Sequence, residues 1–125
     1  MKFLVVDDES DVENLWRQKL RREIRDGVID IQFALSGQEA LDILHSQEHP
    51  DVVYIFSDIN MPGMTGLELL KKVKTEFPEI NVSMISAYGD KENFDQAKSS
   101  GAKEFFTKPV NFDTLKSEII QILES

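Results

Sequence analysis

Short runs of apolar residues alternate along the chain with longer stretches in which apolar residues recur every three or four positions. The three clearest runs, at 3–6, 52–56 and 82–85, are mostly apolar and show no strict alternation of apolar and polar residues. This pattern is typical of parallel strands covered on both faces of a sheet. Weaker strands are predicted at 29–35 and 104–107.

The stretches between these runs carry signals for helix starts. Three of them have the spacing of a capping box, a Ser or Thr followed three residues later by Glu: Ser10 and Glu13, Ser36 and Glu39, Thr65 and Glu68. Asn111 is the predicted cap of the last helix. The first helix has one apolar stripe, made of Val12, Leu15, Trp16, Leu20 and Ile24. The alternating order predicts an α/β fold with a doubly wound, five-stranded parallel sheet and five helices on its two faces.

Composition narrows the possible functions. A chain of 125 residues gives one domain, over 1–125. The absence of Cys excludes disulfides, thiol catalysis and Cys-ligated metals. The net charge of −9 opposes binding to nucleic acid or to an anionic membrane. After Met1-Lys2, a run of only four apolar residues precedes Asp7, too few for a signal peptide or a membrane span. We therefore expect a soluble, cytoplasmic protein that binds neither nucleic acid nor membrane.

Polar residues follow four of the predicted strands, at the end of a doubly wound sheet where ligands bind. They are Asp7-Asp8-Glu9, Ser57-Asp58, Ser86-Ala87 and Thr107-Lys108-Pro109. Three carboxylates at one edge, those of Asp7, Asp8 and Asp58, repel one another unless a cation neutralises them. Oxygen ligands beside a phosphate suit Mg²⁺. The sequence therefore predicts a Mg²⁺ site at this edge.

Asp58 is the predicted nucleophile of this site. A carboxylate beside Mg²⁺ can attack phosphorus and form an aspartyl phosphate. Asp58 closely follows the most apolar strand and precedes a loop with Pro62 and two Gly, which allow a tight turn. The ammonium of Lys108 and the hydroxyl of Ser86 are candidates to hold the transferred oxygens.

The ordered set of Asp7-Asp8, Asp58 with Met61-Pro62-Gly63, Ser86-Ala87 and Lys108-Pro109 resembles the receiver domain of two-component response regulators, over the whole chain. The resemblance implies a flavodoxin-like fold with strand order 2-1-3-4-5. It implies that Asp58 accepts a phosphoryl group from the phosphohistidine of a sensor histidine kinase or phosphotransfer protein. It also implies that Asp8, Asp58 and the Asn60 carbonyl ligate Mg²⁺, that Asp7 acts mainly through a water, and that Lys108-Pro109 is a cis peptide.

The resemblance further implies a switch made of Ser86 and an aromatic residue three positions before Lys108. That aromatic residue is Phe105, which lacks the hydroxyl of a Tyr, and Ser86 stands where Thr is commoner. We expect switching through the position of the ring. By family position, Asn60 and Tyr88 lie at the rim of the phosphorylation site.

We expect the protein to be a signalling switch rather than a turnover enzyme, and to be monomeric when unphosphorylated. Its output partner or effector domain is left open, as is whether it stands alone or is the N-terminal receiver of a longer protein. A flavin-binding electron carrier of the same fold is an alternative, but Asp7-Asp8-Glu9 would repel the flavin phosphate. An aspartyl-phosphate phosphatase is another, but such enzymes have a second acid at the position of Asn60.

Two further motifs have alternative interpretations. Residues 45–49 match the H-x-x-E-H pattern of inverted zinc proteases. That pattern needs an intact helix, and Pro50 follows immediately, so we reject it. The first helix carries a basic cluster. We interpret this cluster as a solvated face of the helix, and a docking surface for an acidic partner kinase is the alternative. Its members are Arg17, Lys19, Arg21, Arg22 and Arg25.

Overall fold

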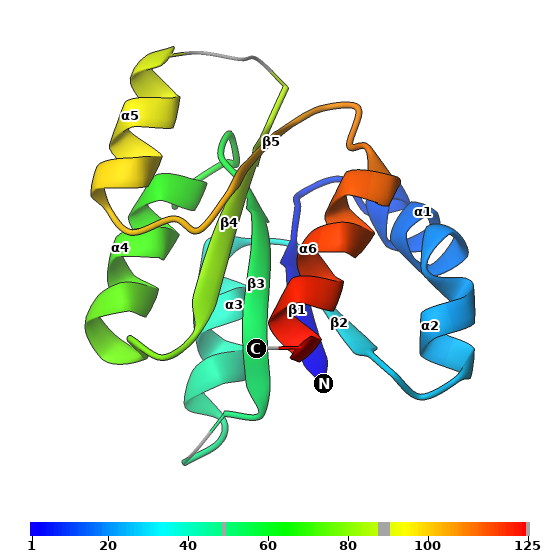
Figure 1. The fold of residues 1–125 in the computed structure, drawn as a ribbon. Coiled ribbons are helices and arrows are strands. Elements are labelled where there is room, and N and C mark those ends of the chain that lie inside the picture. Colours follow the sequence, from blue (N-terminus) through cyan, green and yellow to red (C-terminus); the bar gives the residue numbers. More distant parts are fainter. Residues whose placement is uncertain (49, 88–90, 125) are drawn as a thin grey trace.

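A computed structural model describes the backbone of residues 1–48, 50–87 and 91–124, and their side chains up to residue 122. Its five strands form one parallel sheet in the order β2-β1-β3-β4-β5 (Figure 1). The strands are β1 (Lys2–Val6), β2 (Asp30–Ala34), β3 (Val52–Asp58), β4 (Asn81–Ser86) and β5 (Phe105–Thr107). The helices are α1 (Asp11–Lys19), α2 (Arg21–Arg25), α3 (Gly37–His45), α4 (Gly66–Glu76), α5 (Lys91–Ser99) and α6 (Phe112–Glu124). The predicted doubly wound sheet and its strand order are confirmed.

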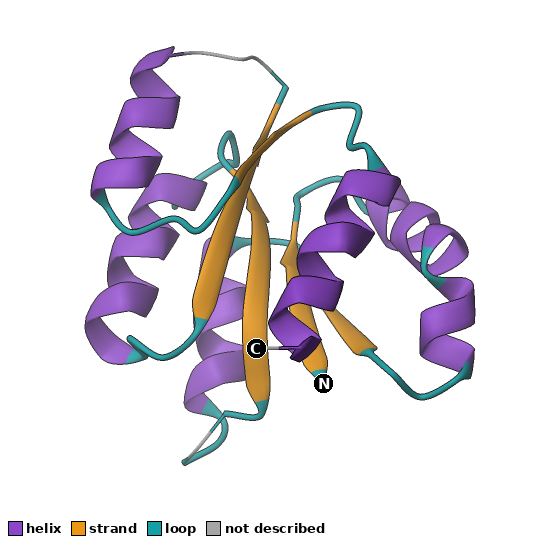
Figure 2. Ribbon diagram, in the orientation of Figure 1, coloured by secondary structure: helices purple, strands orange, loops and turns teal. Residues whose placement is uncertain are grey.

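The two faces of the sheet are covered by different helices (Figure 2). Phe3 and Val5 of β1 pack in a cluster with residues of α1 and α6, whereas Leu4 and Val6 pack in a second cluster with α3, α4 and α5. Neighbouring residues of a strand point to opposite faces, so a continuous apolar run is buried on both sides. This explains why the apolar runs of the sequence show no simple alternation.

The first predicted helix is divided at Leu20, so the described part of the chain has six helices instead of five. Leu20 has φ −107° and ψ 18°, outside the helical region. Its side chain is fully buried. The amide of Leu20 still donates to the carbonyl of Trp16, and the amide of Ile24 to that of Leu20. Helices α1 and α2 are therefore two segments of one bent helix.

The predicted caps are confirmed at three helices and wrong at the first. Thr65 forms a complete capping box with Glu68. The predicted box at Ser36 is half formed: the Ser36 hydroxyl accepts from the Glu39 amide, but the Glu39 carboxylate accepts from the Leu35 amide instead of that of Ser36. The Asn111 side chain accepts from the amides of Asp113 and Thr114. Ser10 makes no side-chain cap, because its backbone already has helical dihedrals rather than the extended ones of a capping residue.

The apolar stripe predicted for the first helix is wrong at Leu15. Its side chain is 44% exposed, while Trp16 and Leu20 of the same stripe are buried. Leu15 lines a groove of about 780 Å³ between α1 and α6, with Val110 and Phe112 on the opposite wall. Helix α6 therefore leaves Leu15 uncovered. Among the described helices, none combines the length and the apolar character needed to cross a membrane.

Candidate functional site

The parallel register brings the candidate residues to one edge of the sheet. Asp7 follows β1, Asp58 ends β3, Ser86 ends β4 and Lys108 follows β5. Val6 pairs with Ser57, Asp58 with Ile85, and Ser86 with Thr107. Residues up to 101 positions apart in sequence therefore meet here.

The three predicted carboxylates form one cluster. Asp7, Asp8 and Asp58 each offer an oxygen, and these oxygens lie within 4.8 Å of one another. Asp7 and Asp58 are both only 7% exposed, while Asp8 is exposed. At an effective dielectric constant of about 20, two charges at this separation repel by about 3 kcal/mol. Such a cluster strongly favours a cation.

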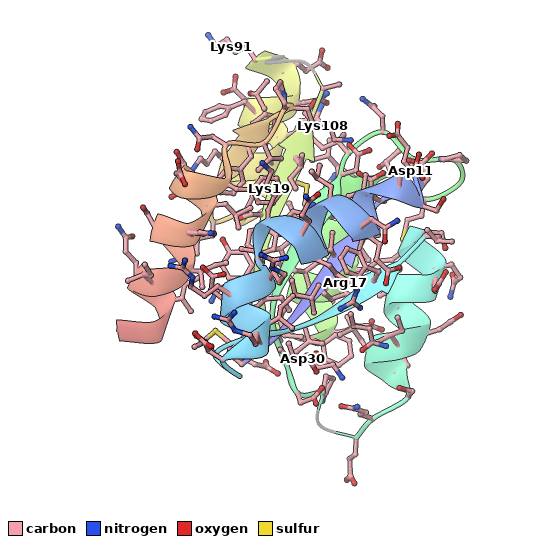
Figure 3. All side chains as sticks on the ribbon, turned by 90° about the vertical axis from the view of Figure 1, so that its right-hand side faces the viewer. Asp11, Arg17, Lys19, Asp30, Lys91 and Lys108 are labelled. Atoms are coloured by element: carbon pink, nitrogen blue, oxygen red, sulfur yellow. The ribbon has the colours of Figure 1, made fainter. Side chains whose placement is uncertain are left out.

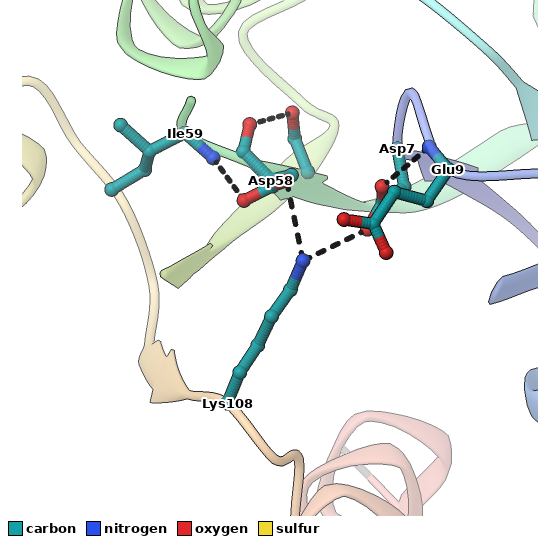
Figure 4. A network of polar contacts seen from close by, with 6 residues as sticks. Asp7, Glu9, Asp58, Ile59 and Lys108 are labelled. Atoms are coloured by element: carbon teal, nitrogen blue, oxygen red, sulfur yellow. Dashed lines mark hydrogen bonds and ion pairs between the residues drawn. The ribbon is translucent and has the colours of Figure 1, made fainter. Parts of the chain in front are cut away.

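Lys108 lies between two of the carboxylates (Figure 4). Its Nζ is 3.2 Å from an oxygen of Asp7 and 3.2 Å from an oxygen of Asp58. Partial burial opposes the ammonium charge, but attraction to Asp58 and Asp7 outweighs it and raises the pKa of Lys108. Three carboxylates and one ammonium still leave two negative charges, which a divalent cation balances.

The Asp58 carboxyl is held by its own backbone. The amide of Ile59 donates to Asp58 Oδ1 at 2.9 Å, leaving Oδ2 on the side of Lys108. Burial raises the pKa of the Asp58 carboxyl, and the charge of Asp7 adds to this, although Lys108 and the Ile59 amide act in the opposite direction. A cation bound at the cluster would favour the ionised form, which is the nucleophilic one.

Asp7 is fixed on the opposite side of Lys108. Its Oδ1 accepts from the amide of Glu9 at 2.9 Å, and its own amide donates to the carbonyl of Ala34 at 3.1 Å. The Lys108 amide donates to the carbonyl of Ser86 at 2.7 Å. The predicted cis peptide between Lys108 and Pro109 is present. Backbone hydrogen bonds thus hold both Asp7 and Lys108 in position.

Gly66 contributes to the site in a way that the sequence analysis missed. Gly63 has φ +75°, as expected for a tight turn, but Gly66 is needed for space. A Cβ at Gly66 would lie 2.0 Å from the carbonyl oxygen of Asp58. The Gly66 amide donates to the carbonyl of Ile59 at 2.8 Å, so α4 begins in direct contact with the backbone of the predicted nucleophile. A Gly at the first position of a capped helix was the available signal.

The remaining predicted residues are placed as follows. Ser86 is fully buried at the end of β4, and Asn60 is exposed two residues after Asp58. Phe105 is half-buried on β5, with its ring 5.5 Å from that of Phe94 on α5. Tyr88 lies outside the described residues.

The rejected zinc motif has no helix over its full length. Helix α3 ends at His45, whose ring pairs with Glu76 at 3.0 Å. His49 lies outside the described residues.

Comparison with known proteins identifies the family. Residues 3–120 match the family model of the response regulator receiver domain. The chain belongs to the receiver family. Sporulation initiation phosphotransferase F of Bacillus subtilis is 34% identical over 122 residues, covering 98% of this chain and 93% of that protein. A chemotaxis protein CheY homolog of Campylobacter jejuni is 34% identical over 125 residues, covering 98% and 92%.

Solved receiver structures have the same fold. A receiver domain protein of Clostridium thermocellum superposes with a TM-score of 0.84 at 28% identity, covering 96% of this chain and 91% of that one. The response regulator TrrA of Thermotoga maritima, solved with Mg²⁺ and beryllofluoride, has a TM-score of 0.78 at 28% identity and covers 96% of each chain. In the present chain, the carboxylate oxygens of Asp7, Asp8 and Asp58 and the two negative charges that Lys108 leaves uncompensated fit Mg²⁺.

Proposed function

We propose that this receiver is a phosphorylation-dependent switch that accepts a phosphoryl group on Asp58 from the phosphohistidine of a histidine kinase or phosphotransfer protein. The proposal treats residues 1–125 as one receiver domain. The observation that carries it is the position of the Asp58 carboxylate, which lies beside the carboxylates of Asp7 and Asp8 and 3.2 Å from the Lys108 ammonium. This arrangement supports Asp58 as the nucleophile, because its carboxylate lies beside both a candidate cation site and a fixed positive charge.

In the proposed reaction, an oxygen of Asp58 forms a bond to phosphorus while the bond from phosphorus to the donor's imidazole nitrogen breaks. The leaving imidazole keeps the electron pair of that bond. Mg²⁺, held by Asp8, Asp58 and the Asn60 carbonyl, with Asp7 acting mainly through a water, would neutralise charge on the phosphoryl oxygens. Lys108 then exchanges its contacts with the two carboxylates for a phosphoryl oxygen, and the Ser86 hydroxyl donates to another.

The switch would act through the last two strands. Ser86 pairs with Thr107 across β4 and β5, and Phe105 lies two residues before Thr107 on β5. A shift of Ser86 toward a phosphoryl group therefore changes the packing of the Phe105 ring. Phe105 has no hydroxyl, so the change is passed on by the ring's position against Phe94. An output protein would read this position.

The groove between α1 and α6 is the proposed approach for the phosphodonor. It is lined by Asp7 and Lys108 of the site, by the exposed Leu15, and by Val110 and Phe112. A donor helix lying in it would bury apolar surface while its histidine reaches Asp58. We infer from this arrangement a protein partner rather than a metabolite that is turned over.

Incubation with acetyl phosphate followed by intact-mass measurement tests the proposal. The wild type should gain the mass of one phosphoryl group in the presence of Mg²⁺, and no mass in the presence of EDTA. Asp58→Asn should stay unmodified, whereas Asp95→Asn, at an exposed position on α5, should behave as the wild type. Equal incorporation in the Asp58 variant and the wild type would contradict the assignment of the nucleophile.

Two measurements on the same samples separate the alternatives. A flavin carrier would be purified with a yellow chromophore, and a phosphatase would hydrolyse a generic aryl phosphate with repeated turnover. We expect neither result, because the chain belongs to the receiver family and this membership supports a signalling switch.

A further inference from the structure

Positive charge is concentrated in one short stretch of this acidic chain. Residues 17–25 carry five basic side chains and one acidic side chain, a net charge of +4. The whole chain has 14 basic and 23 acidic residues. The rest therefore has nine basic and 22 acidic residues, a net charge of −13. Such separation of charge is characteristic of a surface that attracts an oppositely charged partner.

Three of the arginines share one groove. Arg17, Arg21 and Arg25 recur every four residues, and the row continues across the bend at Leu20. Together with Gln18 and Ile24 they line a depression of about 430 Å³, here called the basic groove. Lys19 lines the separate groove between α1 and α6. Figure 3 shows Arg17 and Lys19 on different sides of α1.

The first arginine of the basic groove is held in place. Arg17 Nε is 3.0 Å from Glu13 Oε2, and its Nη2 donates to the carbonyl of Ile31 on the edge strand β2 at 3.3 Å. Its guanidinium also lies 5.2 Å from the centre of the Phe33 ring. These contacts fix one end of the row against the sheet and reduce the entropy lost when a partner binds.

The other two arginines keep donors for a ligand. Arg25 makes one exposed ion pair, with Asp26 at 3.4 Å, and such pairs contribute little to stability. Within the described part of the chain, Arg21 makes no ion pair. Ile24 lies half-buried between the two and adds an apolar contact. The groove therefore offers two available guanidinium groups around an apolar floor.

We propose that the basic groove binds a short acidic segment of a partner protein, with carboxylates spaced one helical turn apart. Guanidinium groups bind carboxylates through two parallel hydrogen bonds. Residues four apart on the partner helix would repeat every 6 Å or so, which matches the row of arginines. The bound segment would thus lie along α1 and α2.

The range of the electrostatic field favours a short segment over an extended polyanion. Fields of exposed charges fall off over about 8 Å at physiological ionic strength. A short segment in the groove meets mainly the net charge of +4 of residues 17–25, which the paired carboxylates of Glu13 and Asp26 reduce to +2. A nucleic-acid duplex or an anionic membrane extends well beyond that distance and meets the net charge of −13 of the other residues. The same protein therefore repels the larger polyanions.

The basic groove is separate from the phosphorylation site. Figure 1 places α2 beside the amino-terminal ends of the strands, whereas Asp58 lies at a carboxyl-terminal end. Changes in the groove should therefore leave acceptance of a phosphoryl group from acetyl phosphate unchanged. This difference allows the groove and the proposed function to be tested independently.

The probes are two labelled synthetic helical peptides, one with Glu at every fourth position and one with Gln at the same positions. Fluorescence anisotropy at about 0.02 M and about 0.15 M salt measures their binding to the full chain. The wild type should bind the Glu peptide at least about tenfold more tightly than the Gln peptide at low salt. The double variant Arg21→Glu/Arg25→Glu should lose this preference.

The matched control is Lys71→Glu/Lys72→Glu, which makes the same change in charge on exposed positions of α4. It should retain the preference for the Glu peptide to within about threefold. Arg21→Gln/Arg25→Gln repeats the test without charge reversal, should the first variant fold poorly. The proposal is overturned by equal binding of both peptides to the wild type, by equal loss in the control, or by tighter binding of a DNA duplex or anionic vesicles than of the Glu peptide.

Discussion

Replacing Gly66 by Ala tests whether the close approach of α4 to Asp58 positions the site. Helix propensity alone predicts a gain, because Ala is up to about 1 kcal/mol more favourable than Gly in a helix. The structure predicts a loss. The added Cβ would lie 2.0 Å from the carbonyl oxygen of Asp58 and 2.9 Å from the Cα of Ile59. Both neighbours are backbone atoms, so neither can rotate away.

The magnitude follows from the distance that must open. Ordinary contacts of a Cβ begin at 3.4 Å, so the gap to the Asp58 oxygen must widen by more than 1 Å. Overpacking of this kind costs about 1–3 kcal/mol, and weakening the hydrogen bond from Gly66 to Ile59 adds about 1 kcal/mol. After the gain in propensity, we expect unfolding to be easier by about 1–3 kcal/mol, or roughly 4–12 °C in Tm. A shift of about 1 Å at the nucleophile should also slow phosphorylation about 10²-fold.

Thermal unfolding and the rate of phosphorylation by acetyl phosphate measure the two effects. Gly37→Ala is the matched control, since the three atoms nearest to its added Cβ all belong to the side chain of Met64, with Sδ at 2.8 Å and Cβ and Cγ at 3.1 Å, and none to the backbone. The thioether can rotate away and the Met64 Cβ needs to move by only a few tenths of an ångström, so we expect a change below about 1 kcal/mol and a normal phosphorylation rate. A Gly66→Ala protein as stable and as reactive as the wild type would refute the reasoning.

Three other predictions concern the carboxylates and the rim of the site. Millimolar Mg²⁺ should raise the Tm of the wild type, because a ligand that binds only the folded state stabilises it. It should raise the Tm of Asp8→Asn less, because that variant lacks one ligating charge. A wild-type Tm that does not change with Mg²⁺ would contradict the metal site. Without divalent cations, Asp58→Asn should unfold at a higher temperature than the wild type at neutral pH. Because burial raises the pKa of the Asp58 carboxyl, the stability present at low pH is lost as the pH rises through that pKa, so the advantage of the variant should disappear at acidic pH. Phosphorylated Tyr88→Glu should lose its phosphoryl group faster than the wild type, since a carboxylate can orient the attacking water. The measurement is the rate of loss of the phosphoryl group from both proteins at fixed Mg²⁺. Equal or slower loss in the variant would show that Tyr88 does not protect the site.

Local sequence determined the elements and the order in which they occur. The apolar runs, the capping box of Thr65 and the cap at Asn111 act within a few residues, so each can be interpreted without the rest of the chain. Parallel strands place their carboxyl ends at one edge of the sheet. This general property is enough to predict, from the sequence, that Asp7, Asp58 and Lys108 lie close together. The candidate site was predictable for that reason.

Only the tertiary structure decided how these residues are packed. Ser10 has the spacing of a capping box but a helical backbone, and Leu15 belongs to an apolar stripe but lies beside a groove. Both outcomes depend on how α1 meets the sheet and α6. The need for Gly66 arises from a contact with Asp58. The four-residue spacing of Arg17, Arg21 and Arg25 is visible in the sequence, but the depression that they line together is a feature of the folded chain. Sequence patterns record the preferences of single elements, whereas burial, close approach and the pKa of Asp58 depend on atoms supplied by other elements of the fold.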